Sequence, residues 1–231
     1  MLDFLKKDLH KLKNPQRAKF LTGFFKTGKG QYGEGDIFLG IRVPDIRKVA
    51  KKYTNLALKD VEKLISDAIH EARLAGLLVL VAIYEKGDKG VQKQIFDFYV
   101  KNAKLVNNWD LVDLTAHRIV GEHLLDKDRS LLYKLAKSDN LWEKRIAVIA
   151  TYAFIKKNQY NDTLKVSKML SHDKHDLIQK AVGWMLRETG KRDQAVLESF
   201  LKKNYKIMPR TTLRYAIERF GEKKRKFYMG K

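Results

Sequence analysis

The sequence predicts an all-α protein, an α-solenoid of the HEAT or armadillo kind in which antiparallel helix pairs follow one another. Proline is scarce, since the 231 residues contain only Pro15, Pro44 and Pro209, and a helix tolerates proline poorly beyond its first turn. From Pro44 onward, amphipathic segments alternate with short polar breaks, and helix pairs recur at roughly 35–45 residues, as in such solenoids. No strong strand pattern occurs outside residues 31–43.

The helices can be expected one by one from their apolar spacing and their start signals. Residues 2–13 place leucines at helical spacing with lysines on the other side. Asn14-Pro15 is a helix start signal, and an apolar stripe is expected on the next helix from Ala18, Leu21, Phe24 and Phe25. Further helices are expected near 44–53, 58–68, 70–86, 89–102, 107–122, 128–138, 141–158, 160–171, 175–190, 193–203 and 209–220. Residues 222–231 are expected to be a frayed basic tail.

A glycine-rich stretch interrupts this pattern, with six of the fourteen glycines between Gly23 and Gly40. Residues 28–33 match a dinucleotide-binding expression, but that motif needs a strand before it and a helix opening on it. Here a helical stripe precedes it, and no helix can start before Pro44. The region near 27–43 is therefore expected to be a loop or a small β-hairpin. Its Lys29 could reach an anionic partner, and a plain solvated loop is the alternative.

The charge of the chain indicates an anionic partner. Lys and Arg total 48 against 27 for Asp and Glu, a net charge of +21, so a concave basic face suited to double-stranded DNA is expected. A membrane is less favoured, because the longest apolar run, residues 74–84, is too short to span a bilayer. No cysteine occurs, which excludes disulfides and thiolate sites and suits a reducing cytoplasm. We expect one domain over residues 1–231, monomeric and cytoplasmic, associating with the nucleoid when bound to DNA.

Metal and nucleophilic sites have little support. His172 and His175 form the only close histidine pair, at a helix boundary where capping is the more common role. His70-Glu71 begins like a zinc-protease helix, but Leu74 stands where the second histidine is required. No Ser, His and Asp are linked by a recognisable pattern. No metal and no cofactor are expected.

Two charged residues occupy helix faces that otherwise look buried. Asp113 shares a face with Trp109 one turn earlier, and Arg145 shares a face with Trp142. A buried charge needs a partner, so Asp113 and Arg145 could pair with each other if their helices stack. A structural ion pair and a carboxylate facing a ligand groove are both open readings. Trp184 is normally a core residue, but beside a groove it could hold a sugar or a cationic base.

Three segments carry a specific resemblance: residues 108–113, residues 141–147 and residues 179–188. They resemble successive signatures of the AlkD-like family of DNA alkylation-repair glycosylases, which are built from HEAT-like repeats. Residues 38–44 resemble the Phe-Leu-Gly-Ile motif of that family, and residues 209–217 its C-terminal basic helix. The resemblance extends from about residue 15 to 220.

The resemblance implies binding of duplex DNA and hydrolysis of the N-glycosidic bond of cationic N-alkylated purines, such as 3-methyladenine and 7-methylguanine, without base flipping. It implies that Asp113 is the catalytic carboxylate, and that Trp109, Trp184 and Phe24 contact the lesioned nucleotide. Phe24 stands where catalytic members place a tyrosine. The expected contacts to the DNA backbone are Arg145, Arg187, Lys180, Arg210, Arg214 and Lys29.

The glycine-rich segment departs from the pattern of the catalytic members and looks like an insertion. Relatives with hairpin insertions bind branched DNA without detectable glycosylase activity. The alternative function is therefore a non-catalytic HEAT-repeat protein that binds branched or distorted DNA through its concave face and this loop. A helical-repeat protein scaffold is a third reading.

Overall fold

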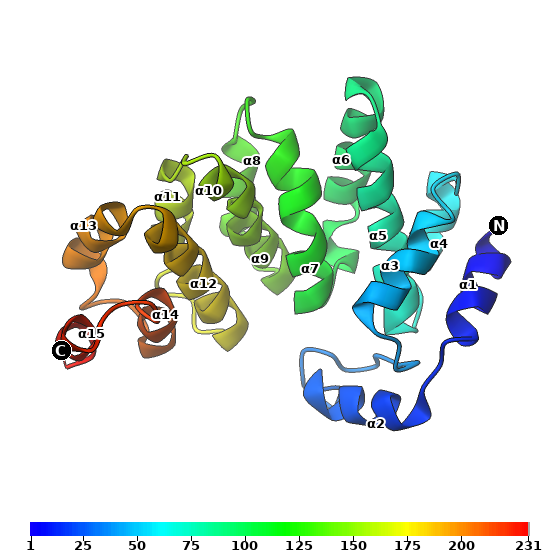
Figure 1. Ribbon diagram of the computed structural model, residues 1–231, viewed down its shortest axis with the longest axis horizontal. Helices are drawn as coiled ribbons and strands as arrows, with labels where there is room; N and C mark the ends of the chain where they lie inside the picture. Colours follow the sequence, from blue (N-terminus) through cyan, green and yellow to red (C-terminus); the bar gives the residue numbers. More distant parts are fainter. Residues whose placement is uncertain (231) are drawn as a thin grey trace. The chain divides into compact units, whose positions relative to one another are not determined.

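The computed structural model describes residues 1–230, and these residues form helices joined by turns (Figure 1). The described residues contain no strand, so the all-α prediction is confirmed, and the succession of helix pairs is that of an α-solenoid. The chain divides into two compact units, Met1–Thr115 and Ala116–Lys231. Each unit is described separately, and the expected single domain stays a prediction.

The first unit is organised around α5 (His70–Lys86), whose apolar run is buried on nearly all sides. The helices α3 (Val43–Lys51), α4 (Leu58–Ile65) and α6 (Lys89–Lys101) pack against it, as does α1 (Leu2–His10). A helix that is apolar all round must lie inside its domain, which explains why the continuous run that could not span a membrane forms the core. The unit ends in a 3-10 turn, Ala103–Leu105, and most of α7 (Trp109–Ala116).

The helix α2 (Pro15–Phe24) is held by its ends and buries none of its residues. Asn14 caps it by accepting a hydrogen bond from the Arg17 N–H, and the Asn14 N–H donates to the Leu39 carbonyl at 2.8 Å. Beyond the other end, the Lys26 carbonyl accepts the Gly33 N–H at 3.2 Å. The Asn14–Leu39 hydrogen bond at its first end and the buried ring of Phe25, directly after its last residue, therefore fix α2, where most helices are fixed by an apolar face.

The glycine-rich stretch forms a loop of turns, and the hairpin alternative was wrong. One isolated parallel bridge joins Ile37 to Ile69, and no ladder forms. Three backbone N–H groups, those of Leu39, Gly40 and Ile41, instead donate to the carboxylate of Glu71 on α5. The segment after the loop thus satisfies its donors on a buried side chain and has no need of a second strand.

The second unit contains α8 (Ser130–Ala136), α9 (Leu141–Ala150), α10 (Tyr152–Lys156), α11 (Asn161–Met169), α12 (Asp176–Arg192), α13 (Gln194–Asn204), α14 (Arg210–Ala216) and α15 (Glu222–Met229). The long helix α12 packs against α9, α11, α13 and α14. Near the start of this unit lies a π-helical turn, His117–Gly121, that follows α7 directly and was not expected from the sequence.

The frayed tail expected at residues 222–231 was wrong for its described part, because residues 222–229 form α15. Tyr228 is buried, with its ring 5.4 Å from that of Tyr205 and 5.9 Å from that of Phe220. Burial of one aromatic side chain contributes up to about 3 kcal/mol, enough to hold a short basic helix against the unit.

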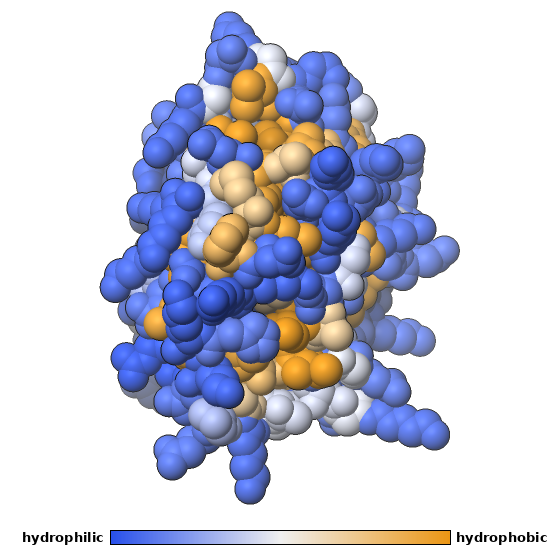
Figure 2. Space-filling model, turned by 90° about the vertical axis from the view of Figure 1, so that its right-hand side faces the viewer, coloured by the Kyte–Doolittle hydropathy of each residue, from blue (hydrophilic) through white to orange (hydrophobic). Residues whose placement is uncertain are grey.

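Exposed large hydrophobic side chains gather near the start of the chain. Of eight such residues, six lie within the first 37 positions: Met1, Phe4, Leu12, Phe20, Phe24 and Ile37. Figure 2 shows the N-terminal end of the molecule, where projecting hydrophilic side chains surround a band of hydrophobic surface. None of the described helices is both long enough and apolar enough to cross a membrane.

Candidate functional site

The start of α7 is fixed by side chains of the residues that precede and open it. The Asn108 side chain accepts the Trp109 N–H at 2.8 Å, and its amide donates to Asp36 at 2.9 Å. Asn108 is fully buried. Trp109 and Asp113 follow one turn apart on the same side of α7, and both are half-buried. The helix thus offers a partly exposed indole and a partly exposed carboxylate from a rigid first turn.

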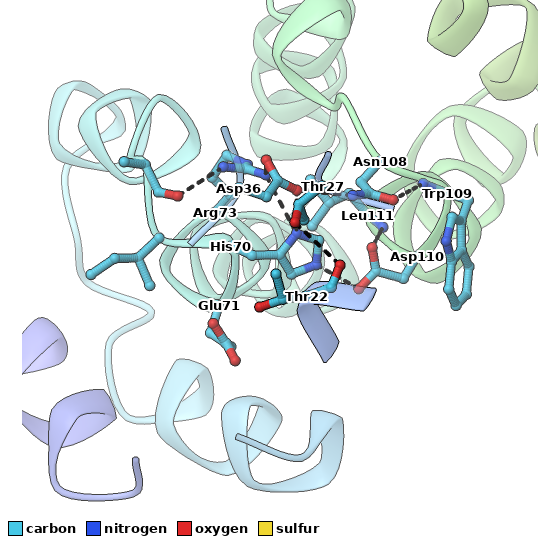
Figure 3. A network of polar contacts seen from close by, with 12 residues as sticks. Thr22, Thr27, Asp36, His70, Glu71, Arg73, Asn108, Trp109, Asp110 and Leu111 are labelled. Atoms are coloured by element: carbon cyan, nitrogen blue, oxygen red, sulfur yellow. Dashed lines mark hydrogen bonds and ion pairs between the residues drawn. The ribbon is translucent and has the colours of Figure 1, made fainter. Parts of the chain in front are cut away.

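A buried network of charges anchors that turn to the rest of the first unit (Figure 3). The His70 imidazole lies between two carboxylates, with Nδ1 3.1 Å from Asp36 and Nε2 2.8 Å from Asp110. The Arg73 guanidinium donates to the other oxygen of Asp36 at 2.5 Å. Asp36 belongs to the glycine-rich loop, His70 and Arg73 to α5, and Asp110 to α7. The network therefore ties the loop and α7 to the core helix.

The pKa shifts of His70 and Asp36 favour the charged form of both groups. Burial disfavours a charged imidazole, but the charge and hydrogen bond of Asp110 and the hydrogen bond of Asp36 outweigh it and raise the pKa of His70 to about 9. Burial also disfavours ionised Asp36, but the hydrogen bond from His70 and the charge of Arg73 hold its pKa below the ordinary value. At neutral pH, His70 is thus an imidazolium that donates to two carboxylates.

Aromatic rings cover this network and one face of Trp109. Phe25 lies flat on Trp109, with ring centroids 4.9 Å apart and planes 7° apart, and Phe24 meets Trp109 edge-on at 5.9 Å. Phe25 and Phe38 also lie over the His70 ring, at 4.9 and 4.7 Å. We call Phe20, Phe24, Phe25 and Trp109 the aromatic row. Only the face of Trp109 away from Phe25 can receive a ligand.

The second unit holds the remaining residues predicted for the site. Arg145 on α9 is buried, and it donates to the Leu177 carbonyl at the start of α12. Trp184 on α12 is half-buried, its indole N–H donating to Glu188 at 3.2 Å, with the Tyr152 ring 6.4 Å away. Arg145 therefore joins two helices of its unit, and part of the indole of Trp184 remains accessible.

The cations predicted to bind the DNA backbone differ in the ion pairs that they form within the protein. Lys180 pairs with Asp176 on the same helix at 2.6 Å, and Arg187 pairs with Glu218 of α14 and with Glu188. A phosphate that binds Arg187 would compete with Glu218. The other three predicted cations are exposed: Arg210, which donates to the Met229 carbonyl, and Arg214 and Lys29.

The structure brings the predicted residues together as two sets, each within its own unit. Phe24, Trp109 and Asp113 belong to the first unit. Arg145, Lys180, Trp184 and Arg187 lie on α9 and α12, which pack together in the second.

Comparison with known proteins identifies the family. A family model described as DNA alkylation repair enzyme matches residues 5–220. The chain belongs to this family. The solved structure of a predicted DNA alkylation repair enzyme from Enterococcus faecalis has the same fold, with a TM-score of 0.71 and 16% identity over 91% of this chain and 97% of that one. No curated protein matches the chain.

Sequence reasoning missed the charge network of this DNA alkylation repair family member. The signal was present, because His70 and Arg73 lie at the start of the most apolar helix, where a charge needs partners. Asp36 carried no comparable signal within its glycine-rich loop. As to metals, no group of three or more His, Cys, Asp or Glu side chains among the described residues could hold an ion.

Proposed function

We propose that the chain is a DNA glycosylase that hydrolyses the N-glycosidic bond of cationic N-alkylated purines in duplex DNA, such as 3-methyladenine and 7-methylguanine. Membership of the DNA alkylation repair family supports a repair enzyme, and the net charge of +21 supports DNA as its substrate. The observation that carries the proposal is the pair Trp109 and Asp113, one turn apart on α7 and half-exposed.

Cleavage of this N-glycosidic bond requires little from the protein beyond a carboxylate in a fixed position. When the C1′–N bond breaks, its electron pair goes to the base and neutralises the positive ring, so no strong general acid is needed. Positive charge then develops on the sugar, where the Asp113 carboxylate stabilises the oxocarbenium-like state. Water adds to C1′ and loses a proton, and the products are the free base and an abasic sugar. Asp113 orients this water.

The remaining residues bind the substrate in this proposal. Trp109 and Trp184 contact the sugar and backbone of the lesioned nucleotide, together with Phe24, and the base is not flipped into a pocket. The covered face of Trp109 restricts the ligand to the other face of the indole. The phosphates are bound by six cations: Arg145, Arg187, Lys180, Arg210, Arg214 and Lys29. The enzyme acts as a cytoplasmic monomer on the nucleoid.

Release of 7-methylguanine from methylated duplex DNA tests the proposal. Asp113→Asn should lower the rate by about 10²-fold or more, because it removes a charge that acts in the transition state. Asp126→Asn is the matched control, since Asp126 is exposed and forms no ion pair among the described residues. Equal release of 7-methylguanine by the wild type and Asp113→Asn would show that Asp113 has no catalytic role.

A second candidate function is binding of branched or distorted DNA without catalysis. The glycine-rich loop favours it, because the loop is anchored through Asp36 and still exposes Lys29. A gel-shift comparison of fork, junction and plain duplex, each with wild type and Asp113→Asn, separates the two functions. Preference for junctions with no base release by either protein would favour the binding function.

A further inference from the structure

Two exposed phenyl rings on α2 form the outer part of the aromatic row. Phe20 and Phe24 lie one turn apart, with centroids 5.8 Å apart and planes 20° apart. Phe20 is 66% exposed and Phe24 53% exposed. A contiguous aromatic surface left in water commonly marks a binding site, and α2 buries no residue that could account for these rings through folding.

The row continues from this surface to the candidate site. Phe24 contacts the edge of Trp109, which lies against the buried Phe25. The rings of Phe20 and Phe24 already touch, so a flat ligand cannot insert between them without separating them. It can stack on the outer side of Phe20, which is the open end of the row.

The segment that carries Phe20 and Phe24 is basic. Residues 13–33 include five Lys and Arg and no Asp or Glu: Lys13, Arg17, Lys19, Lys26 and Lys29. None of the five forms an ion pair among the described residues. Arg17 precedes Phe20 by one turn and, with Arg42, lines an open pocket of about 340 Å³. Asp45 also lines it, but its carboxylate pairs with Lys48 at 3.5 Å.

We infer that Phe20 binds an unpaired nucleobase of DNA by stacking on its outer side, with Phe24 supporting the ring from behind, while Arg17 and Lys19 bind the phosphates beside it. Single-stranded DNA combines flat apolar faces with a regular negative charge, and proteins bind it with aromatic rings in a basic setting. Paired bases within a duplex hide their faces, so the site takes a bulged, mispaired or single-stranded base. This inference rests on the proposed binding of DNA and adds a second contact outside the lesion.

The test uses the full chain and two 2-aminopurine duplexes, one with the reporter base bulged and one perfectly paired. Stacking quenches 2-aminopurine, so its fluorescence reports the contact directly. The wild type should bind the bulged duplex about 10-fold more tightly and quench the reporter. Phe20→Ala should abolish both effects, because one stacked base accounts for about that factor, and Phe20→Trp should retain them.

Two control variants distinguish stacking on Phe20 from the loss of any exposed phenyl ring and from the loss of a positive charge. Phe4 on α1 is 67% exposed, so Phe4→Ala matches Phe20→Ala in surface removed and should leave both affinities unchanged. Lys19→Gln should weaken binding to both duplexes alike. It should also reduce the slope of the logarithm of the binding constant against the logarithm of the salt concentration by about one.

Equal affinity of the wild type for the two duplexes would overturn the inference. So would a Phe20→Ala defect seen only on vesicles of anionic phospholipid, which would assign the surface to a membrane. Release of 7-methylguanine without a bulge preference contradicts the inference and leaves the glycosylase proposal standing. A bulge preference that depends on Phe20, without base release, supports the inference and contradicts the glycosylase proposal.

Discussion

Phe25 lies flat on Trp109, with their planes 7° apart and their centroids at 4.9 Å. The residue that precedes the glycine-rich loop therefore covers one face of the indole that opens α7. This contact makes the loop region part of the candidate site, since it determines which face of Trp109 remains for a ligand.

Phe25→Ala should destabilise the first unit and expose the second face of Trp109. Phe25 is 6% exposed, and removal of a buried phenyl ring costs about 3–5 kcal/mol. Urea unfolding measures the loss, and the tryptophan emission should shift to longer wavelength as Trp109 becomes more solvated. Phe4→Ala, at an exposed position, should change stability by less than about 0.5 kcal/mol. A similar small effect for Phe25→Ala would contradict the stacking described.

Asp36→Asn should be strongly destabilising. The substitution removes the carboxylate that His70, Arg73 and Asn108 share, and breaking a buried ion pair from one side costs about 3–5 kcal/mol. Asp45→Asn is the control, because its pair with Lys48 is exposed and worth less than about 1 kcal/mol. If the two variants unfold at the same urea concentration, Asp36 does not anchor the loop.

Stability should fall between about pH 6.5 and 9. The folded pKa of His70 is raised from 6.5 to about 9, so its contribution is complete below pH 6.5 and is lost as the pH rises through the folded value. The effect is on the order of 3 kcal/mol. Asp36, with its lowered pKa, acts oppositely: its contribution is present above its unfolded pKa and is lost in acid.

His70→Gln tests this origin of the pH dependence. The groups that face the imidazole are Asp36, Asp110 and Arg73, so no second histidine shares this network. Thermal unfolding at several pH values should therefore give a flatter curve for the variant in this window. Parallel curves for both proteins would assign the dependence to other groups.

Gly40→Ala should cost more than Gly35→Ala, although both glycines have φ of +84°. Both substitutions share the strain of a left-handed residue, about 1–2 kcal/mol. At Gly35 an added Cβ meets nothing within 4 Å, whereas at Gly40 it would lie 2.2 Å from the Asn14 carbonyl oxygen. The difference in unfolding free energy isolates the steric clash with the start of α2. Equal losses would show that α2 can move aside without cost.

The sequence could predict those features that depend on neighbours along the chain. The helix expected at residues 70–86 forms over His70–Lys86, because its apolar run and the glycine after it are local signals. Trp109 and Asp113 were expected on one side of a helix, and a four-residue spacing suffices for that. The family resemblance found from short motifs was confirmed by the match over residues 5–220.

Features that depend on distant partners could not be predicted. Asp36 and His70 are 34 positions apart, and Asp110 lies 40 positions beyond His70, so no spacing rule connects them. The helix at residues 222–229 was missed for the same reason, since Tyr228 is buried against Tyr205 and Phe220. The roles of Asp113, Arg145 and Trp184 stay predictions, because they concern a substrate.

The attachment of α2 at its two ends, by the Asn14–Leu39 hydrogen bond and by the buried ring of Phe25, separates folding from recognition in this part of the chain. Residues within α2 itself are not buried, so its outward side chains can be exchanged with little effect on stability. Mutations can accumulate there, in evolution or in a laboratory library, and alter ligand preference while the core helix α5 remains untouched. The helix is therefore a natural position at which to engineer new specificity.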